Sequence, residues 1–187
     1  MVSNDSYPSS ERSARMPHAF GLLRKLHLLF LAALVVFPPL LSAQWNATIG
    51  AQSADLGRQG LAFLPNEIWI HAGESITWSM AANEAHTVTF LANGQPRPPF
   101  TVGCPGFSTD PASFDGTTCA MSALLFKGDQ FTVVFPVVGN FKLICLVHTD
   151  MTGAIHVLDA SQPLPHDQAF YDRVVQRETK DLWVRAS

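Results

Sequence analysis

The chain has 187 residues, a hydrophobic content of 47% and a formal net charge of −3. This length suits one folded domain with appendages, and the apolar content is sufficient for one hydrophobic core. The weak acidic charge argues against a broad basic surface, so we expect no nucleic-acid partner. An odd number of cysteines (Cys104, Cys119 and Cys145) leaves at least one thiol unpaired within the monomer, and this thiol is a candidate for chemistry.

Residues 1–43 have the pattern of an export signal. Four basic residues precede an apolar run over 26–41, and Ser42-Ala43 supplies small residues at the expected cleavage site. The alternative is an uncleaved anchor that tethers the chain to a membrane. The run is marginal for a span of about 20 residues, and two prolines near its end favour cleavage. Either interpretation predicts an exported protein, periplasmic or otherwise extracytoplasmic, where disulfides form.

Residues 44–158 predict an all-β domain with the character of a β-sandwich. Short runs alternate between apolar and polar residues, and turn residues separate them at regular spacing. No long amphipathic helix pattern occurs in this range. The predicted strands are residues 47–53, 67–71, 75–80, 86–90, 131–135, 141–145 and 154–158.

Residues 93–122 predict a long surface loop inserted in this domain, because five prolines exclude a central strand. The segment holds Cys104 and Cys119, and a disulfide closing it would stabilise the fold by about 3 kcal/mol. Metal binding by this pair is the alternative, but no histidine lies inside the loop and the spacing is too wide for a CxxC-type site. We favour the disulfide, which leaves Cys145 as the free thiol.

Residues 159–187 predict a linker followed by a C-terminal helix. Pro163 and Pro165 mark the linker, and Asp167 is a candidate N-cap for a helix that ends near Trp183. Apolar residues at helical spacing favour packing on the sandwich over binding of a partner.

The segment 145–153 carries the chemistry, because Cys145, His148 and Met151 lie within seven residues between two predicted strands. A loop held taut by those strands points the three side chains to a common point. His86, which opens a strand elsewhere in the chain, is the candidate fourth ligand. One thiolate, two imidazoles and a thioether suit copper as both Cu(I) and Cu(II). Zinc gains little from a thioether, and iron oxygenase sites need carboxylate ligands.

These motifs resemble the cupredoxin family, which includes plastocyanin, pseudoazurin and amicyanin. The resemblance covers residues 68–158 and rests on Gly73–Trp78, on Ala85–Phe90 and on the Cys145-x-x-His148-x-x-Met151-x-Gly153 spacing, which is similar to amicyanin's short ligand loop. It implies a Greek-key β-sandwich with one copper ion, held by His86, Cys145 and His148 with Met151 as axial ligand. It also implies one-electron transfer through the exposed edge of His148. The chain departs from the family at Thr87, where an asparagine is common, and at Thr149-Asp150, where a proline often follows the histidine.

The function expected from these features is that of a type 1, or blue, copper protein that carries single electrons between unidentified redox proteins. A copper-sequestering or copper-delivery protein of the same fold is the alternative, but delivery sites usually lack a buried thiolate. A copper enzyme would need further domains and His-x-His pairs, which the sequence does not contain, so we expect no enzyme. His71 and His156 are expected to be structural or surface residues.

Overall fold

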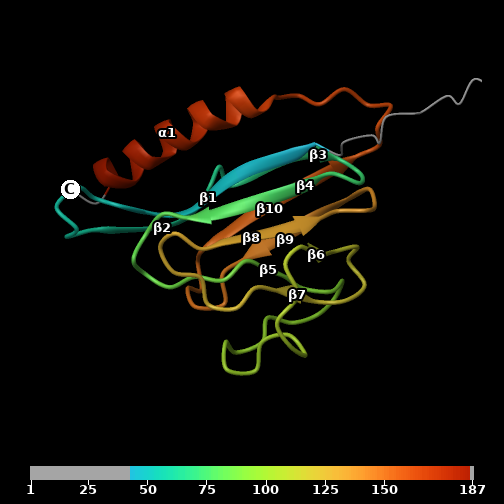
Figure 1. The fold of residues 1–187 in the computed structure, drawn as a ribbon, viewed down its shortest axis with the longest axis horizontal. Helices are drawn as coiled ribbons and strands as arrows, with labels where there is room; N and C mark the ends of the chain where they lie inside the picture. Colours follow the sequence, from blue (N-terminus) through green and yellow to red (C-terminus); the bar gives the residue numbers. More distant parts are fainter. Residues whose placement is uncertain (1–42, 186–187) are drawn as a thin grey trace, which may run out of the picture. The chain divides into compact units, whose positions relative to one another are not determined.

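The computed structural model describes residues 43–185, and this region consists of two β-sheets and one C-terminal helix (Figure 1). Each sheet has five strands. The first sheet has the order β2 (Gln59–Leu64), β1 (Gln44–Gln52), β4 (Ser75–Met80), β8 (Gln130–Val134) and β6 (Ala112–Ser113). The second has the order β3 (Glu67–His71), β10 (Thr152–Leu158), β9 (Gly139–Ile144), β5 (Thr89–Phe90) and β7 (Ala120–Met121).

From β2 to β9 the chain alternates between the two sheets, whereas β1–β2 and β9–β10 are antiparallel pairs within one sheet. Strand β1 pairs in parallel with β4, and β3 pairs in parallel with β10, so sequence neighbours such as β3 and β4 lie in different sheets. Gly73 turns the chain between those two strands with a φ of +89°, a conformation that a residue with a Cβ rarely adopts. The all-β sandwich expected from the alternating pattern is confirmed.

The inner faces of both sheets form one aromatic core. The side chains of Trp78, Phe90 and Phe135 are completely buried, and the ring of Phe90 lies 5.8 Å from Trp78 and 5.2 Å from Phe135, centroid to centroid. Rings at these separations gain favourable edge and face contacts beyond the area they bury. This core supports the strands that lead into the loops carrying His86 and Cys145.

Residues 93–122 are predicted as a surface loop, but in the structure they also contribute to both sheets and to the core. They contain β6 and β7, which extend one edge of each sheet, and they place Phe114 in the core with its ring 5.1 Å from that of Phe90. The proline content correctly excludes a central strand, but it gives no information about two-residue edge strands. The predicted Cys104–Cys119 disulfide is present, and Cys145 is a free, buried thiol.

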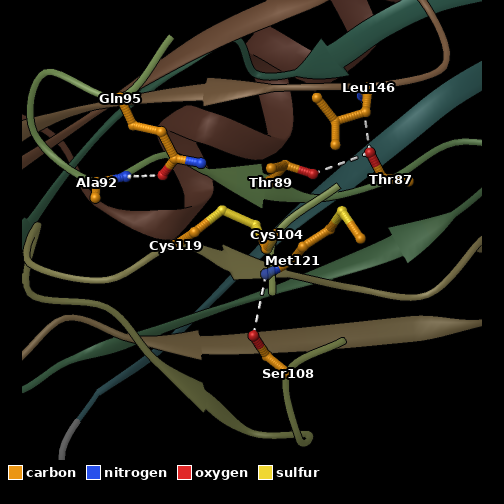
Figure 2. The surroundings of a disulfide bond; sticks show 9 residues. All are labelled: Thr87, Thr89, Ala92, Gln95, Cys104, Ser108, Cys119, Met121 and Leu146. Atoms are coloured by element: carbon orange, nitrogen blue, oxygen red, sulfur yellow. Dashed lines mark hydrogen bonds between the residues drawn. A yellow bond between two sulfur atoms is a disulfide. The ribbon is translucent and has the colours of Figure 1, made fainter. Parts of the chain in front are cut away.

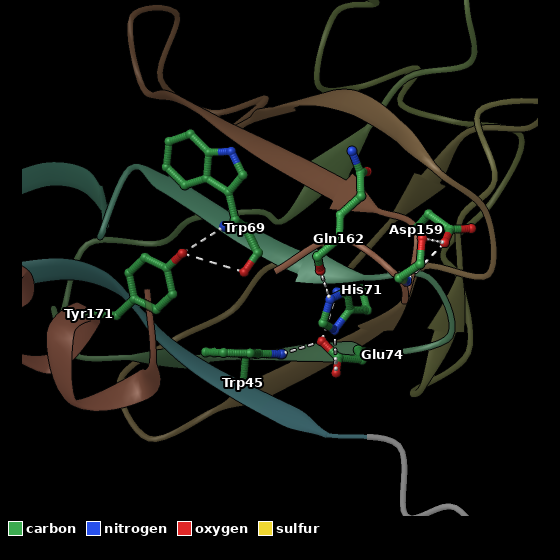
Figure 3. Close-up of polar contacts among 8 residues, drawn as sticks. Trp45, Trp69, His71, Glu74, Asp159, Gln162 and Tyr171 are labelled. Atoms are coloured by element: carbon green, nitrogen blue, oxygen red, sulfur yellow. Dashed lines mark hydrogen bonds and ion pairs between the residues drawn. The ribbon is translucent and has the colours of Figure 1, made fainter. Parts of the chain in front are cut away.

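The C-terminal helix α1 (Gln168–Arg185) begins at the predicted cap and packs on β1 and β2 (Figure 1). Asp167 caps it through the hydrogen bond that its Oδ1 accepts from the backbone N–H of Phe170, at 2.8 Å. Tyr171 ties the helix to β3, because its hydroxyl oxygen accepts the N–H of Trp69 at 2.8 Å (Figure 3). The helix therefore packs on the sandwich, as its spacing of apolar residues predicts.

The predicted export signal, residues 1–43, lies outside the described residues except for Ala43. Within residues 43–185, no helix is both long enough and apolar enough to cross a membrane.

Candidate metal centre

Three of the four predicted ligands meet at one end of the sandwich. Cys145 follows β9 directly, and His148 lies in the short loop that joins β9 to β10. His86 comes from a separate loop, where its backbone N–H and C=O both bond to Leu125, at 3.2 and 2.9 Å. Backbone pairing therefore fixes the approach of each segment before any metal binds.

The candidate ligand atoms form a small triangle. The Nδ1 atoms of His86 and His148 are 3.1 Å apart, and each lies 3.7 Å from the Sγ atom of Cys145. The centre of this triangle is about 2 Å from all three atoms, which is close to the roughly 2.0–2.3 Å at which imidazole nitrogen and thiolate sulfur bind zinc-sized ions. The residues present therefore fit a single metal ion.

Burial favours the metal-binding form of His86. The side chains of His86 and Cys145 have no exposed surface, whereas that of His148 is 18% exposed. Desolvation, with a smaller contribution from the nearby His148, lowers the pKa of His86 to about 4. His86 is therefore neutral at physiological pH, as a metal-ligating imidazole must be.

Gly50 makes room for the buried ring of His86. It lies at an irregularity in the pairing of β1 with β2, has a φ of +67°, and a Cβ placed there would lie 2.8 Å from the Cβ of Ala82 and 3.1 Å from Nε2 of His86. The strand bends at this irregularity, beside the site, which is a common place for a β-bulge. A larger residue at position 50 would displace the histidine.

Thr87 connects the two segments that carry the ligands. Its backbone N–H points to Sγ of Cys145 at 3.4 Å, and its hydroxyl oxygen accepts the N–H of Leu146 at 2.9 Å (Figure 2). The threonine thus bonds to the ligand loop at the position where the family often has asparagine. Thr87 and Thr89 are fully buried, which the strand pattern does not predict. Leu146 bonds to Thr87, and Met121 of the 93–122 segment pairs with Thr89.

Met151 lies in the same loop and is buried, with 2% of its surface exposed. Its carbonyl oxygen accepts the N–H of Cys145 at 3.0 Å, and its own N–H bonds to the carbonyl of His148 at 3.4 Å. These two bonds close the loop from Cys145 to Met151 on itself. Met151 also belongs to the packed cluster that contains Cys145, so its side chain is on the inner side of the loop.

Two charged residues beside the site, Glu84 and Arg97, are not predicted from the sequence. A carboxylate oxygen of Glu84 lies 3.5 Å from Nε2 of His148, the nitrogen that faces away from the triangle. Arg97 donates hydrogen bonds to three carbonyl oxygens of the ligand loop. Glu84 has a weak signal, since it lies two residues before His86, whereas the position of Arg97 depends on how a proline-rich segment folds.

The remaining strand histidines have other partners. His156 stacks on Trp69 and bonds to Glu67 and Asn140, and His71 lies beside Glu74. Among residues 43–185, the grouping of His86, Cys145 and His148 is the one set of three or more histidine, cysteine and acidic residues placed to hold a metal. One thiolate and two imidazoles form a donor set typical of copper sites.

No curated protein matches the sequence. Among solved structures, the chain is similar to a mutant of amicyanin in its reduced Cu(I) form at pH 4, with 15% identity, a TM-score of 0.43 and coverage of 63% of this chain and 84% of that chain. It is also similar to an oxidized amicyanin mutant, with 15% identity, a TM-score of 0.43 and coverage of 62% and 82%.

A family model for copper binding proteins of the plastocyanin/azurin family matches residues 51–158, which is more than half of the chain. The matched region runs from β1 to the end of β10 and includes the whole candidate metal centre. Together with the donor set, the match identifies copper as the cofactor. The chain therefore belongs to the plastocyanin/azurin family of copper binding proteins.

Proposed function

We propose that the chain is a type 1 copper protein that carries one electron at a time between redox partners outside the cytoplasm. His86, Cys145 and His148 hold one copper ion, and Met151 is the fourth, weaker ligand. The observation that carries this proposal is the triangle of two imidazole nitrogens and one thiolate sulfur, with edges of 3.1, 3.7 and 3.7 Å. A set of two histidines and one cysteine with a weak axial methionine is the ligand arrangement of blue-copper electron-transfer sites.

Copper at this site supplies a one-electron couple between Cu(I) and Cu(II). The chain holds the ligands rigidly and shields them from water, because backbone bonds hold both ligand loops and His86 and Cys145 are fully buried. Fixed ligands move little when the charge of the site changes, and a small rearrangement favours fast electron transfer. His148 is the one member of the triangle that reaches the surface, so we infer that electrons enter and leave through its ring.

The same burial favours a carrier over a copper-delivery protein. Delivery requires that an incoming ligand reach the metal, but two of the three triangle residues have no exposed surface. Four protein ligands would also leave the ion without an open position for a substrate, so we propose a carrier and no enzyme. Export is proposed from the basic and apolar pattern of residues 1–43, with cleavage or a membrane tether as the two outcomes.

Visible absorption of the chain with Cu(II) tests this function. Charge transfer from the thiolate to Cu(II) gives an intense visible band, which we expect in the wild type and not in Cys145→Ser. The matched control is the double variant Cys104→Ser, Cys119→Ser, which replaces the two disulfide-bonded cysteines but not the free thiol and should keep the band. A band that survives Cys145→Ser would contradict the proposal.

Electron transfer and delivery are separated by a second measurement on the copper-loaded chain. A carrier is reduced and reoxidised by small inorganic complexes over many cycles while a Cu(I) chelator removes little metal. Rapid loss of copper to the chelator, with slow electron exchange, would support the delivery function instead.

A further inference from the structure

Arg97 contacts the loop that carries three of the proposed ligands, although it belongs to the segment 93–122. Its Nη2 atom donates to the carbonyl oxygens of Cys145 at 2.6 Å and His148 at 3.3 Å, and its Nη1 atom donates to that of Thr149 at 3.3 Å. One planar guanidinium thus bonds to three carbonyls of one short loop. Two of those carbonyls belong to proposed copper ligands.

The segment that carries Arg97 is itself fixed against the strand that leads to Cys145. A second hydrophobic cluster joins the disulfide to Ile144 and Leu146, the residues on either side of Cys145. Figure 2 shows the disulfide beside Met121, with Leu146 and Thr87 in the same surroundings. The guanidinium is therefore held by a braced segment and is not the end of a freely moving side chain.

The charge of Arg97 is not neutralised by an acidic neighbour. Within residues 43–185, each carboxylate found in an ion pair lies against a histidine, and none pairs with Arg97. Arg97 is half-buried and keeps its charge at every relevant pH. A unit positive charge is therefore hydrogen-bonded to the backbone carbonyl of Cys145, the residue that supplies the thiolate.

We propose that Arg97 is a positioning residue that holds the ligand loop in its metal-binding shape and raises the reduction potential of the bound copper. This inference rests on the proposed function. The oxidised site carries one more positive charge than the reduced site, so a nearby cation destabilises Cu(II) relative to Cu(I). The three-carbonyl contact also needs the planar fork of arginine, which lysine cannot reproduce.

Arg97→Gln removes the positive charge together with the guanidinium hydrogen bonds. Coulomb's law for two unit charges about 8 Å apart gives roughly a tenfold change in equilibrium at an effective dielectric of about 30, which lies between the values for a protein surface and for water. We therefore expect the ratio of Cu(I) to Cu(II) affinity to fall about tenfold, which lowers the one-electron potential by about 59 mV. The matched control is Arg173→Gln, which removes the same charge from α1 beside Trp45 and should leave the potential unchanged.

Hydrogen exchange of the metal-free chain measures the positioning role without copper. The backbone amides of residues 146–151 should exchange at least several-fold faster in Arg97→Gln and in Arg97→Lys than in the wild type. Arg97→Lys keeps the charge, so its potential should stay closer to that of the wild type than to that of Arg97→Gln.

The outcomes distinguish this inference from the proposed function. A wild type without the thiolate band refutes the proposed function itself. A wild type and an Arg97→Gln variant that share the band and the potential overturn the inference and leave the carrier function intact. If Arg97→Gln no longer folds, Arg97→Lys provides the test. Unchanged amide exchange in Arg97→Lys, or a potential about 59 mV lower despite the retained charge, overturns the inference.

Discussion

Thr87 tests how the chain fixes the ligand loop before the metal binds. Its hydroxyl oxygen accepts the backbone N–H of Leu146 at 2.9 Å and lies 3.0 Å from the hydroxyl of Thr89. Thr87→Val keeps the shape of the side chain but leaves a buried N–H without an acceptor. Such a group destabilises a folded protein by about 1–3 kcal/mol. We expect the free energy of unfolding of the metal-free chain to fall by about 2 kcal/mol and the melting temperature to fall by roughly 4–8 °C.

Urea denaturation of the metal-free chain measures this loss. Thr87→Ser retains the hydroxyl and should lose less, and Thr101→Val, at an exposed position, should stay within about 0.5 kcal/mol of the wild type. The N–H that points to the sulfur of Cys145 belongs to the backbone, so Thr87→Val should keep the visible band. A loss below about 0.5 kcal/mol for Thr87→Val would refute the reasoning that this hydroxyl anchors the loop.

Three further predictions concern the disulfide, the buried histidine and the exposed ligand. Replacing Cys104 and Cys119 with serine opens a loop with a sequence separation of 15, so denaturation should show a loss of about 3 kcal/mol; full stability would contradict this. His86 has a pKa of about 4 in the folded chain, so the unfolded chain takes up its proton first on acidification. The metal-free chain should therefore lose on the order of 3 kcal/mol between pH 6.5 and pH 4 through this group, and His86→Gln should flatten that dependence in pH-dependent denaturation; an equal slope in both proteins would refute it. Glu84→Gln removes a half-exposed carboxylate near Nε2 of His148, so voltammetry should show a potential raised by about 10–40 mV; a lowered potential would be inconsistent with the assigned geometry.

The sequence predicts the parts of the site that depend on short-range order. The spacing from Cys145 to Met151 between two alternating runs requires a tight loop, and the structure has that loop between β9 and β10. Asp167 before an amphipathic segment predicts the start of α1, which is confirmed. These features are local, because each depends on residues only a few positions apart.

The parts that the sequence does not predict depend on tertiary contacts. Strand β2 is missed because Gly60 weakens its pattern and Pro65 follows it closely, and its pairing with β1 comes from the folded context. The edge strands β6 and β7 have two residues each, which is too short for a periodic pattern. Arg97 reaches Cys145 across 48 positions of sequence, and no local signal indicates that contact.

A crystal structure of the copper-loaded chain, with anomalous diffraction at the copper edge, tests the central claim most directly. The account predicts one copper ion at bonding distance from the Sγ atom of Cys145 and from the Nδ1 atoms of His86 and His148, with Met151 as its fourth, weaker ligand. Copper bound through the outer nitrogen of His148 to Glu84, or at any place away from Cys145, would contradict the account.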